Sequence, residues 1–164
     1  MTVFAIVGAG WRSEFFLRIA RALPERFACC GVVARNAEKG QAFERRWEVP
    51  TFRTLDALLK KTSPRFVISS VPRDVNPGIL KNLAQRGVPS LSETPLAPDV
   101  PRLVDLCETL DKLNAKAQYL EQVALRPHHQ AQLAVARSGK LGRITEAQFS
   151  VAHGYHGISL MRKF

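Results

Sequence analysis

The chain has 164 residues, of which 46% are hydrophobic and 23% charged, a composition that excludes disordered, collagen-like and coiled-coil proteins. A chain of this length supports its own core without disulfides or a structural metal, and its three cysteines lack the spacing of either. The formal net charge of +10 points to an anionic partner: nucleic acid, a membrane surface or a phosphorylated small molecule. Because we find no long basic run, membrane-length apolar segment or signal sequence, we expect a cytoplasmic protein without a membrane or nucleic-acid partner. Nucleic acid stays an alternative that rests on the charge alone.

Strand and helix patterns alternate along the first 121 residues. Short apolar runs rich in β-branched residues predict strands at 3–7, 27–33, 51–52, 66–71, 90–92 and 117–123. Apolar residues at helical spacing predict helices at 15–23, 36–47, 54–59, 75–86 and 99–110, and Asn36, Thr54 and Asp99 are the expected N-caps of the second, third and fifth of these helices. The spacing in the last helix places Cys107 in the core. This alternation predicts an α/β fold with a doubly wound parallel sheet.

The pattern changes after Gln122. We predict a helix at 129–138, a glycine-containing turn at 138–142, a strand at 144–151 and a short amphipathic end at 158–164. This tail is too short to carry its own core. We therefore expect one domain at 1–121 and, at 122–164, the incomplete start of a second α/β domain in a truncated chain.

A glycine motif lies between the first predicted strand and the first predicted helix. It consists of Gly8, Gly10, Trp11, Arg12 and Ser13, with Ala9 between the glycines. In this setting the first glycine permits a tight turn, the second lets a pyrophosphate approach the backbone, and the helix N-terminus offers free N–H groups. The motif predicts a dinucleotide site, and the alternative is a plain tight turn.

The residues after the second and fourth strands refine this prediction. An acid that binds the ribose of NAD is missing after the second strand, where Arg35 stands instead. Arg35 suits the 2′-phosphate of NADP, so we expect NADP to be preferred and NAD to be possible, unless Arg35 is only a solvated surface residue. Val71 and Pro72 end the fourth strand, where ligands bind in such sheets. Pro72 either walls the cofactor site or only starts the next helix.

Four segments, in this order and spacing, resemble the Gfo/Idh/MocA family of oxidoreductases: VGAGWRSEFFLRIARAL, VISSVPRDVN, GVPSLSETPLAPD and SGKLGRITEAQFSVAHGYH. The resemblance implies an N-terminal Rossmann domain joined to a second α/β domain with an open sheet. It also implies hydride transfer between NAD(P) and a sugar, cyclitol or related carbonyl or alcohol, and a homo-oligomer.

The resemblance further assigns residues near the nicotinamide. Glu93, Thr94 and Pro95 match a family Glu-Lys-Pro motif in which the lysine lies near the reacting carbon. Thr94 offers a hydroxyl in place of that cation. Glu93 and Pro95 are expected to shape the nicotinamide pocket, or else merely to lead into the next helix. Asn76 is a second departure, because it matches a histidine common in the family.

The resemblance places the proton chemistry on His156. A histidine suits the role because it gives or takes a proton near neutral pH. His153 stands where the family often has an acid, and two histidines without further ligands predict no metal site. The neighbouring His128 and His129 are expected at the surface or in helix-capping roles.

Together these residues predict an NAD(P)-dependent oxidoreductase, with His156 and Thr94 in the catalytic roles and a polyol or carbonyl compound as substrate. The alternative is a non-catalytic dinucleotide-binding sensor or scaffold on the same fold, because Thr94 removes a catalytic group of the family.

Overall fold

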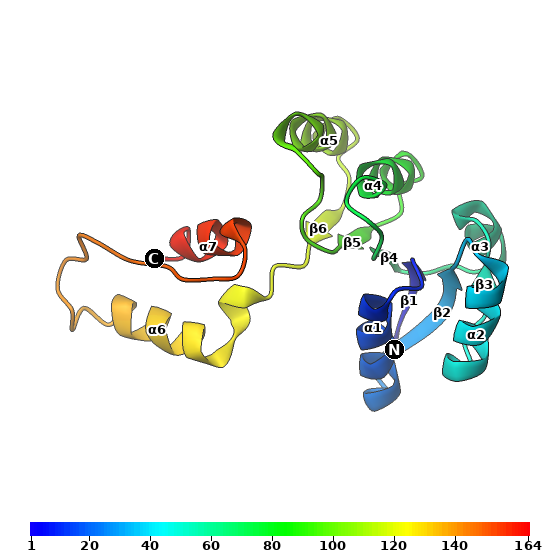
Figure 1. Cartoon of the computed structure of the whole chain (residues 1–164), viewed down its shortest axis with the longest axis horizontal. Helices are drawn as coiled ribbons and strands as arrows, with labels where there is room; N and C mark the ends of the chain where they lie inside the picture. Colours follow the sequence, from blue (N-terminus) through cyan, green and yellow to red (C-terminus); the bar gives the residue numbers. More distant parts are fainter. The chain divides into compact units, whose positions relative to one another are not determined.

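The first 119 residues form a parallel sheet of six strands in the order β3-β2-β1-β4-β5-β6 (Figure 1). The strands are β1 (Thr2–Val7), β2 (Phe27–Val33), β3 (Thr51–Phe52), β4 (Phe66–Ser69), β5 (Ser90–Ser92) and β6 (Ala117–Tyr119). The chain starts in the middle of the sheet, winds out to β3, returns to β4 beside β1 and winds out again to β6. This is the doubly wound α/β topology that the sequence predicts.

Helices cover both faces of this sheet. They are α1 (Trp11–Ala22), α2 (Ala37–Trp47), α3 (Leu55–Lys61), α4 (Asn76–Gln85) and α5 (Val100–Lys112). Alternate residues of β1 point to opposite faces. Phe4 and Ile6 pack with α1 and α2 on one face, while Ala5 and Val7 pack with α3 and α4 on the other. Burial on both faces explains why β1 is a continuous apolar run rather than an alternating one.

The structure, a computed structural model, describes all 164 residues, and residues 120–164 form a second unit. This unit holds a short 3₁₀ helix η1 (Val123–Leu125) and the helices α6 (Pro127–Arg137) and α7 (Gly154–Met161). Its small core contains Val123, Ala124 and Leu160, with Phe149 and Val151 packed against it.

The strand expected at 144–151 is wrong, because this segment has no regular secondary structure. A strand needs a neighbour to pair its backbone groups, and the second unit holds no other strand. The strands expected at 66–71 and 117–123 are also shorter than predicted, ending at Ser69 and Tyr119. Ser92, the last residue of β5, pairs with both Ser69 and Tyr119. The three neighbouring strands therefore end side by side.

The expected burial of Cys107 is also wrong, because its side chain is exposed. The buried side of α5 is centred on Leu106, which is fully buried, with Leu103 and Leu110 partly buried beside it. Cys107 lies on the flank of that stripe, one residue further around the helix.

The longest helix, α5, has 13 residues, and none of the helices has both the length and the apolar character that crossing a bilayer requires.

The cysteines are expected to differ in reactivity. Burial raises the pKa of the Cys29 thiol to about 12, and burial also raises the pKa of Cys30. Because the thiolate is the nucleophile, iodoacetamide at about pH 8 should label the exposed Cys107 at least about tenfold faster than Cys29. Peptide mapping by mass spectrometry measures the rates, and urea should make them similar. Equal rates in the folded chain would contradict the arrangement of α5.

Candidate functional site

A groove of about 870 Å³ lies at the carboxyl ends of β1, β2 and β4. Its walls are the turn between β1 and α1 and the loops that follow β2, β3 and β4. Four strands end at the same level here, at Val7, Ser69, Ser92 and Tyr119. Ligands of doubly wound sheets bind at this edge, where the strand order reverses between β1 and β4.

Gly8 is fixed by its surroundings. Its φ is +114°, and a Cβ there would lie 2.1 Å from the carbonyl oxygen of Ser70. Gly10 is different, because its φ is −89° and a Cβ there would meet nothing within 4 Å. The protein itself therefore requires glycine at position 8, whereas the lack of a side chain at position 10 leaves room in the groove beside the start of α1.

The rest of the glycine motif forms the first turn of α1. Ser13 is fully buried and its hydroxyl donates a 2.8 Å hydrogen bond to the carbonyl of Gly8, so it closes the turn from inside. Gly10 is the N-cap and has no side chain to accept from the helix. The first N–H groups of α1, those of Trp11 and Arg12, therefore remain for a ligand. The side chains of Trp11 and Arg12 do not line the groove.

Three cations line the groove after β2 and β3. They are Arg35, Lys39 and Arg53, and no Asp or Glu lies among the lining residues. The Arg53 guanidinium donates to the carbonyl oxygens of Ala34 (2.6 Å), Asn36 (2.6 Å) and Ala37 (3.2 Å), which fixes the loop that carries Arg35.

Lys39 and Arg53 are not among the site residues predicted from the sequence. Arg53 reaches its partners across up to 19 residues, which no local pattern reveals. The one signal was Gly40 inside a helix, where a Cβ would lie 2.6 Å from the Arg53 guanidinium. A glycine within a helical pattern costs stability and so indicates a close packing contact.

Val71 and Pro72 line the groove from the loop after β4. Pro72 lies outside α4, since its carbonyl accepts hydrogen bonds from the N–H groups of Val75 (3.0 Å) and Asn76 (3.1 Å) in a turn before the helix. Pro72 therefore lines the groove and is not the first residue of a helix, and its contact with a cofactor stays a prediction.

The segment after β5 is held by an ion pair and does not line the groove. Arg12 Nη2 lies 2.6 Å from Glu93 Oε2, although 81 residues separate them in sequence. Glu93 is 15% exposed and Arg12 36% exposed, so the pair is partly shielded from water. Thr94 and Pro95 follow, joined by a cis peptide bond. The structure thus brings two of the predicted cofactor residues together, Arg12 and Glu93.

The buried side chain of Asn76 holds the same region together by hydrogen bonds. It is 2% exposed, its Oδ1 accepts from the Ser69 hydroxyl (2.7 Å), and its Nδ2 donates to Ser92 Oγ (2.9 Å) and to the carbonyl of Leu96 (2.9 Å). An amide both donates and accepts, so one side chain ties the ends of β4 and β5 to the loop beyond Pro95. The sequence analysis identified Asn76 only as a departure from the family pattern.

His156 forms a close pair with an acid in the second unit. Its Nδ1 lies 2.7 Å from Glu121 Oε2, and the two side chains are 12% and 6% exposed. The rings of His153 and Tyr155 lie beside that of His156. Glu121 was missed because 35 residues separate it from His156. No three His, Cys, Asp or Glu side chains gather closely enough to hold a metal ion.

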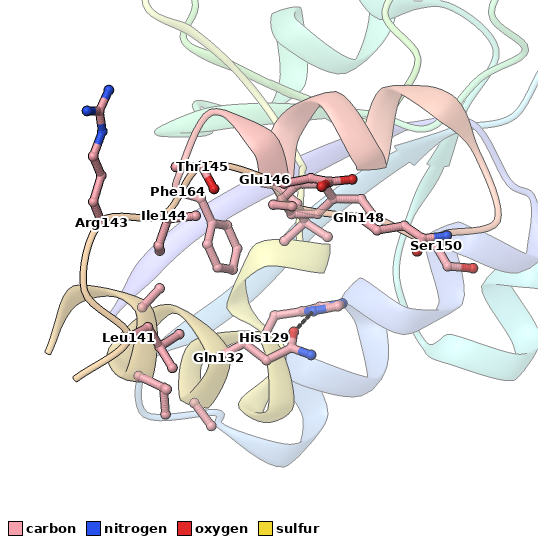
Figure 2. A pocket seen from close by; sticks show the side chains of 16 residues that line it. His129, Gln132, Leu141, Arg143, Ile144, Thr145, Glu146, Gln148, Ser150 and Phe164 are labelled. Atoms are coloured by element: carbon pink, nitrogen blue, oxygen red, sulfur yellow. Dashed lines mark hydrogen bonds between the residues drawn. The ribbon is translucent and has the colours of Figure 1, made fainter. Parts of the chain in front are cut away.

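A second cavity, of about 880 Å³, lies within the second unit between α6 and residues 141–150. Figure 2 shows Leu141, Ile144 and Phe164 toward one end and the polar side chains of His129 and Gln132 toward the other. His129 Nδ1 lies 3.0 Å from Gln132 Oε1. His129 is half-buried, whereas His128 is exposed, as predicted. No sequence pattern indicated this cavity.

Residues 2–120 match the model of the Gfo/Idh/MocA oxidoreductase family, NAD-binding Rossmann fold. The search of curated proteins gave no match.

The structure also resembles solved structures, at identities that show a shared fold. One is the WlbA dehydrogenase of Bordetella pertussis in complex with NADH and UDP-GlcNAcA (TM-score 0.79, 21% identity, 87% of this chain and 43% of that one). Another is an oxidoreductase of Agrobacterium radiobacter in complex with NAD⁺, L-tartaric acid and magnesium (0.80, 15%, 98% and 54%). A third is the biliverdin reductase of Synechocystis sp. PCC 6803 with biliverdin and NADP⁺ (0.69, 18%, 87% and 44%). The chain thus spans roughly half the length of these proteins.

The two glycines of the motif should respond differently to alanine. Gly8→Ala forces a Cβ against the Ser70 carbonyl at a positive φ, and it should lower the free energy of unfolding by about 2–4 kcal/mol. Gly10→Ala meets no atom, so it should stay within about 0.5 kcal/mol of the wild type. Urea denaturation measures both, and equal stabilities for the two variants would contradict the geometry of the turn.

Proposed function

Because the chain belongs to the Gfo/Idh/MocA family of oxidoreductases, we propose that it binds a nicotinamide dinucleotide, preferring NADP over NAD, in the groove at the carboxyl ends of β1, β2 and β4. The observation that carries the proposal is the room beside Gly10. A pyrophosphate fits against a backbone without a side chain, at the N-terminus of a helix whose first N–H groups are free.

The preference for NADP is supported by the charges that line the groove after β2 and β3. Arg35, Lys39 and Arg53 line it without any acid, and a 2′-phosphate adds an anion where NAD has only a hydroxyl. Arg35 is exposed and free of ion pairs, so its guanidinium is available for a bidentate contact with that phosphate. Arg53 is committed to backbone carbonyls and holds the loop in place.

We further propose that the protein transfers a hydride between the nicotinamide, which supplies the redox chemistry, and a polyol, sugar, cyclitol or related carbonyl compound. One of the similar structures contains NADH with UDP-GlcNAcA, and another contains NAD⁺ with L-tartaric acid. UDP-GlcNAcA and L-tartaric acid both carry hydroxyl groups. The Thr94 hydroxyl would donate to the substrate oxygen, and His156 would take or return its proton. Glu93 and Pro95 would shape the nicotinamide pocket, with Glu93 oriented by Arg12.

A second candidate is a dinucleotide-binding sensor or scaffold without turnover. The observation that favours it is Thr94, which stands in place of the motif lysine and supplies no cation. The groove and its cations serve this function equally well, so only turnover distinguishes the two candidates.

Cofactor preference follows from the role assigned to Arg35. Fluorescence titration should show NADPH binding at least about tenfold more tightly than NADH, and Arg35→Asp should weaken NADPH binding by about 10–100-fold while leaving NADH within about threefold. Arg45→Asp is the matched control, because this exposed arginine of α2 lies outside the groove and undergoes the same charge change. Equal affinities in the wild type would contradict the NADP preference, and no binding of either cofactor would contradict the site.

Turnover should separate the enzyme from the sensor. We expect the wild type to reduce NADP⁺ with at least one member of a panel of polyols, sugars and hydroxy acids. Thr94→Val keeps the shape of the side chain but removes the hydroxyl, so kcat should fall by about tenfold or more. If the wild type is silent and Thr94→Lys turns over the same panel, the sensor function is favoured instead.

A further inference from the structure

Glu121 occupies the Nδ1 side of the His156 ring. Glu121 Oε2 lies 2.7 Å from His156 Nδ1. Both side chains are largely shielded from water, at 6% and 12% exposure, so neither exchanges this contact freely with solvent. The pair joins the segment before η1 to the first turn of α7.

The carboxylate itself is held in place by the backbone. Its other oxygen, Oε1, accepts a 2.9 Å hydrogen bond from the N–H of Val123. Val123 is 3% exposed and belongs to the core of the second unit together with Ala124 and Leu160, the last of which comes from α7. Glu121 is therefore anchored at both oxygens by elements that pack against each other.

This arrangement selects one form of the neutral imidazole ring. A carboxylate only accepts hydrogen bonds, so the ring nitrogen that faces it has to carry the proton. The other ionisable side chains beside the ring are His153 and Tyr155, from the start of the same helix. The 3₁₀ helix η1 that packs on α7 consists of Val123, Ala124 and Leu125 and adds no titratable group.

The second ring nitrogen, Nε2, is left without a partner. It makes no hydrogen bond in the chain, and the only buried side-chain nitrogen or oxygen without a partner is the Trp47 indole nitrogen. Nε2 therefore keeps some contact with solvent, in a side chain that is 12% exposed. Because Nδ1 faces the carboxylate, Nε2 is the ring nitrogen that is left to exchange a proton with another group.

We propose that Glu121 is a positioning residue that holds neutral His156 as the Nδ1–H tautomer, so that Nε2 is the atom that exchanges a proton with the substrate hydroxyl. The proposal rests on the oxidoreductase function proposed above. In the direction of alcohol oxidation, the O–H proton would move to Nε2, and a bound nicotinamide would accept the hydride from the carbon that carries this hydroxyl. The ring then carries a positive charge next to the Glu121 carboxylate, and in the reverse direction Nε2 returns the proton.

The tautomer can be observed without substrate or cofactor. In the ¹⁵N-histidine-labelled chain at about pH 9, above the usual range for histidine titration, a long-range ¹H–¹⁵N correlation spectrum should show His156 protonated at Nδ1 and unprotonated at Nε2. The spectrum of His156→Asn assigns the signal. A wild-type His156 in the Nε2–H form would overturn the proposal, and this result needs no variant of Glu121 that folds.

Substitution of the acid tests its role directly. In Glu121→Ala the signal should move toward the Nε2–H form, and a signal that stays in the Nδ1–H form would overturn the proposal. Glu146→Ala is the matched control, because this exposed acid of the same unit has no histidine partner and its removal should leave the His156 signal unchanged. With a substrate that turns over, Glu121→Ala should lower kcat at least about 100-fold while KM stays within about threefold.

The cofactor titration separates this proposal from the one on which it rests. An Nε2–H tautomer in a chain that binds NADPH overturns the role of Glu121 alone. An Nδ1–H tautomer that depends on Glu121, in a chain that binds neither cofactor, supports the positioning of the ring and overturns the proposed cofactor site.

Discussion

The close approach of β1 and β4 at their carboxyl ends is the constraint on which the groove depends. Val7 pairs with Ser69, and the next residue on each strand brings Gly8 against the carbonyl of Ser70. No side chain fits at Gly8, so the backbone turns there with a positive φ, and the buried Ser13 hydroxyl returns to close the turn on the Gly8 carbonyl. The start of α1 is thereby directed at the edge of the sheet where ligands bind. The turn at the groove therefore requires glycine at position 8, because the backbone of Ser70 lies where a side chain would be.

The positive charge of the groove depends on the backbone contacts of Arg53, whose side chain is exposed. Arg53 satisfies three backbone carbonyls, and Gly40 leaves the space that its guanidinium occupies. This fixes the loop that carries Arg35, and Lys39 follows in the first turn of α2. Three like charges on one half-enclosed wall repel each other, and no carboxylate of the wall offsets this repulsion. A bound phosphate would offset it, which is why charge placement, rather than the overall excess of cations, argues for a phosphorylated ligand.

Features encoded over a few residues were predictable from the sequence, and contacts between distant segments were not. The six strands of the sheet and the capping side chains were found because alternation and capping depend on neighbouring residues; the caps are Asn36, Thr54 and Asp99. The strand expected at 144–151 failed because a strand also requires a partner, which apolar pattern alone does not supply. For the same reason the sequence did not reveal Arg12 as the partner of Glu93 or Glu121 as the partner of His156, because these partners lie 81 and 35 residues away. The sequence thus predicts which residue types belong to the candidate site, but it does not predict which of these residues pair with each other.

The loop that carries Thr94 is supported by Asn76. Asn76 ties β4 and β5 to the carbonyl of Leu96, and this support does not involve the side chain of Thr94. The chemistry that remains is restricted by the groups assigned to it. Arg12 does not release its proton, and a threonine hydroxyl shares a proton but does not store one. On the proposed function, a group that takes up and returns a proton is still required, and the imidazole of His156, whose Nδ1 lies 2.7 Å from Glu121 Oε2, is the one suited to it.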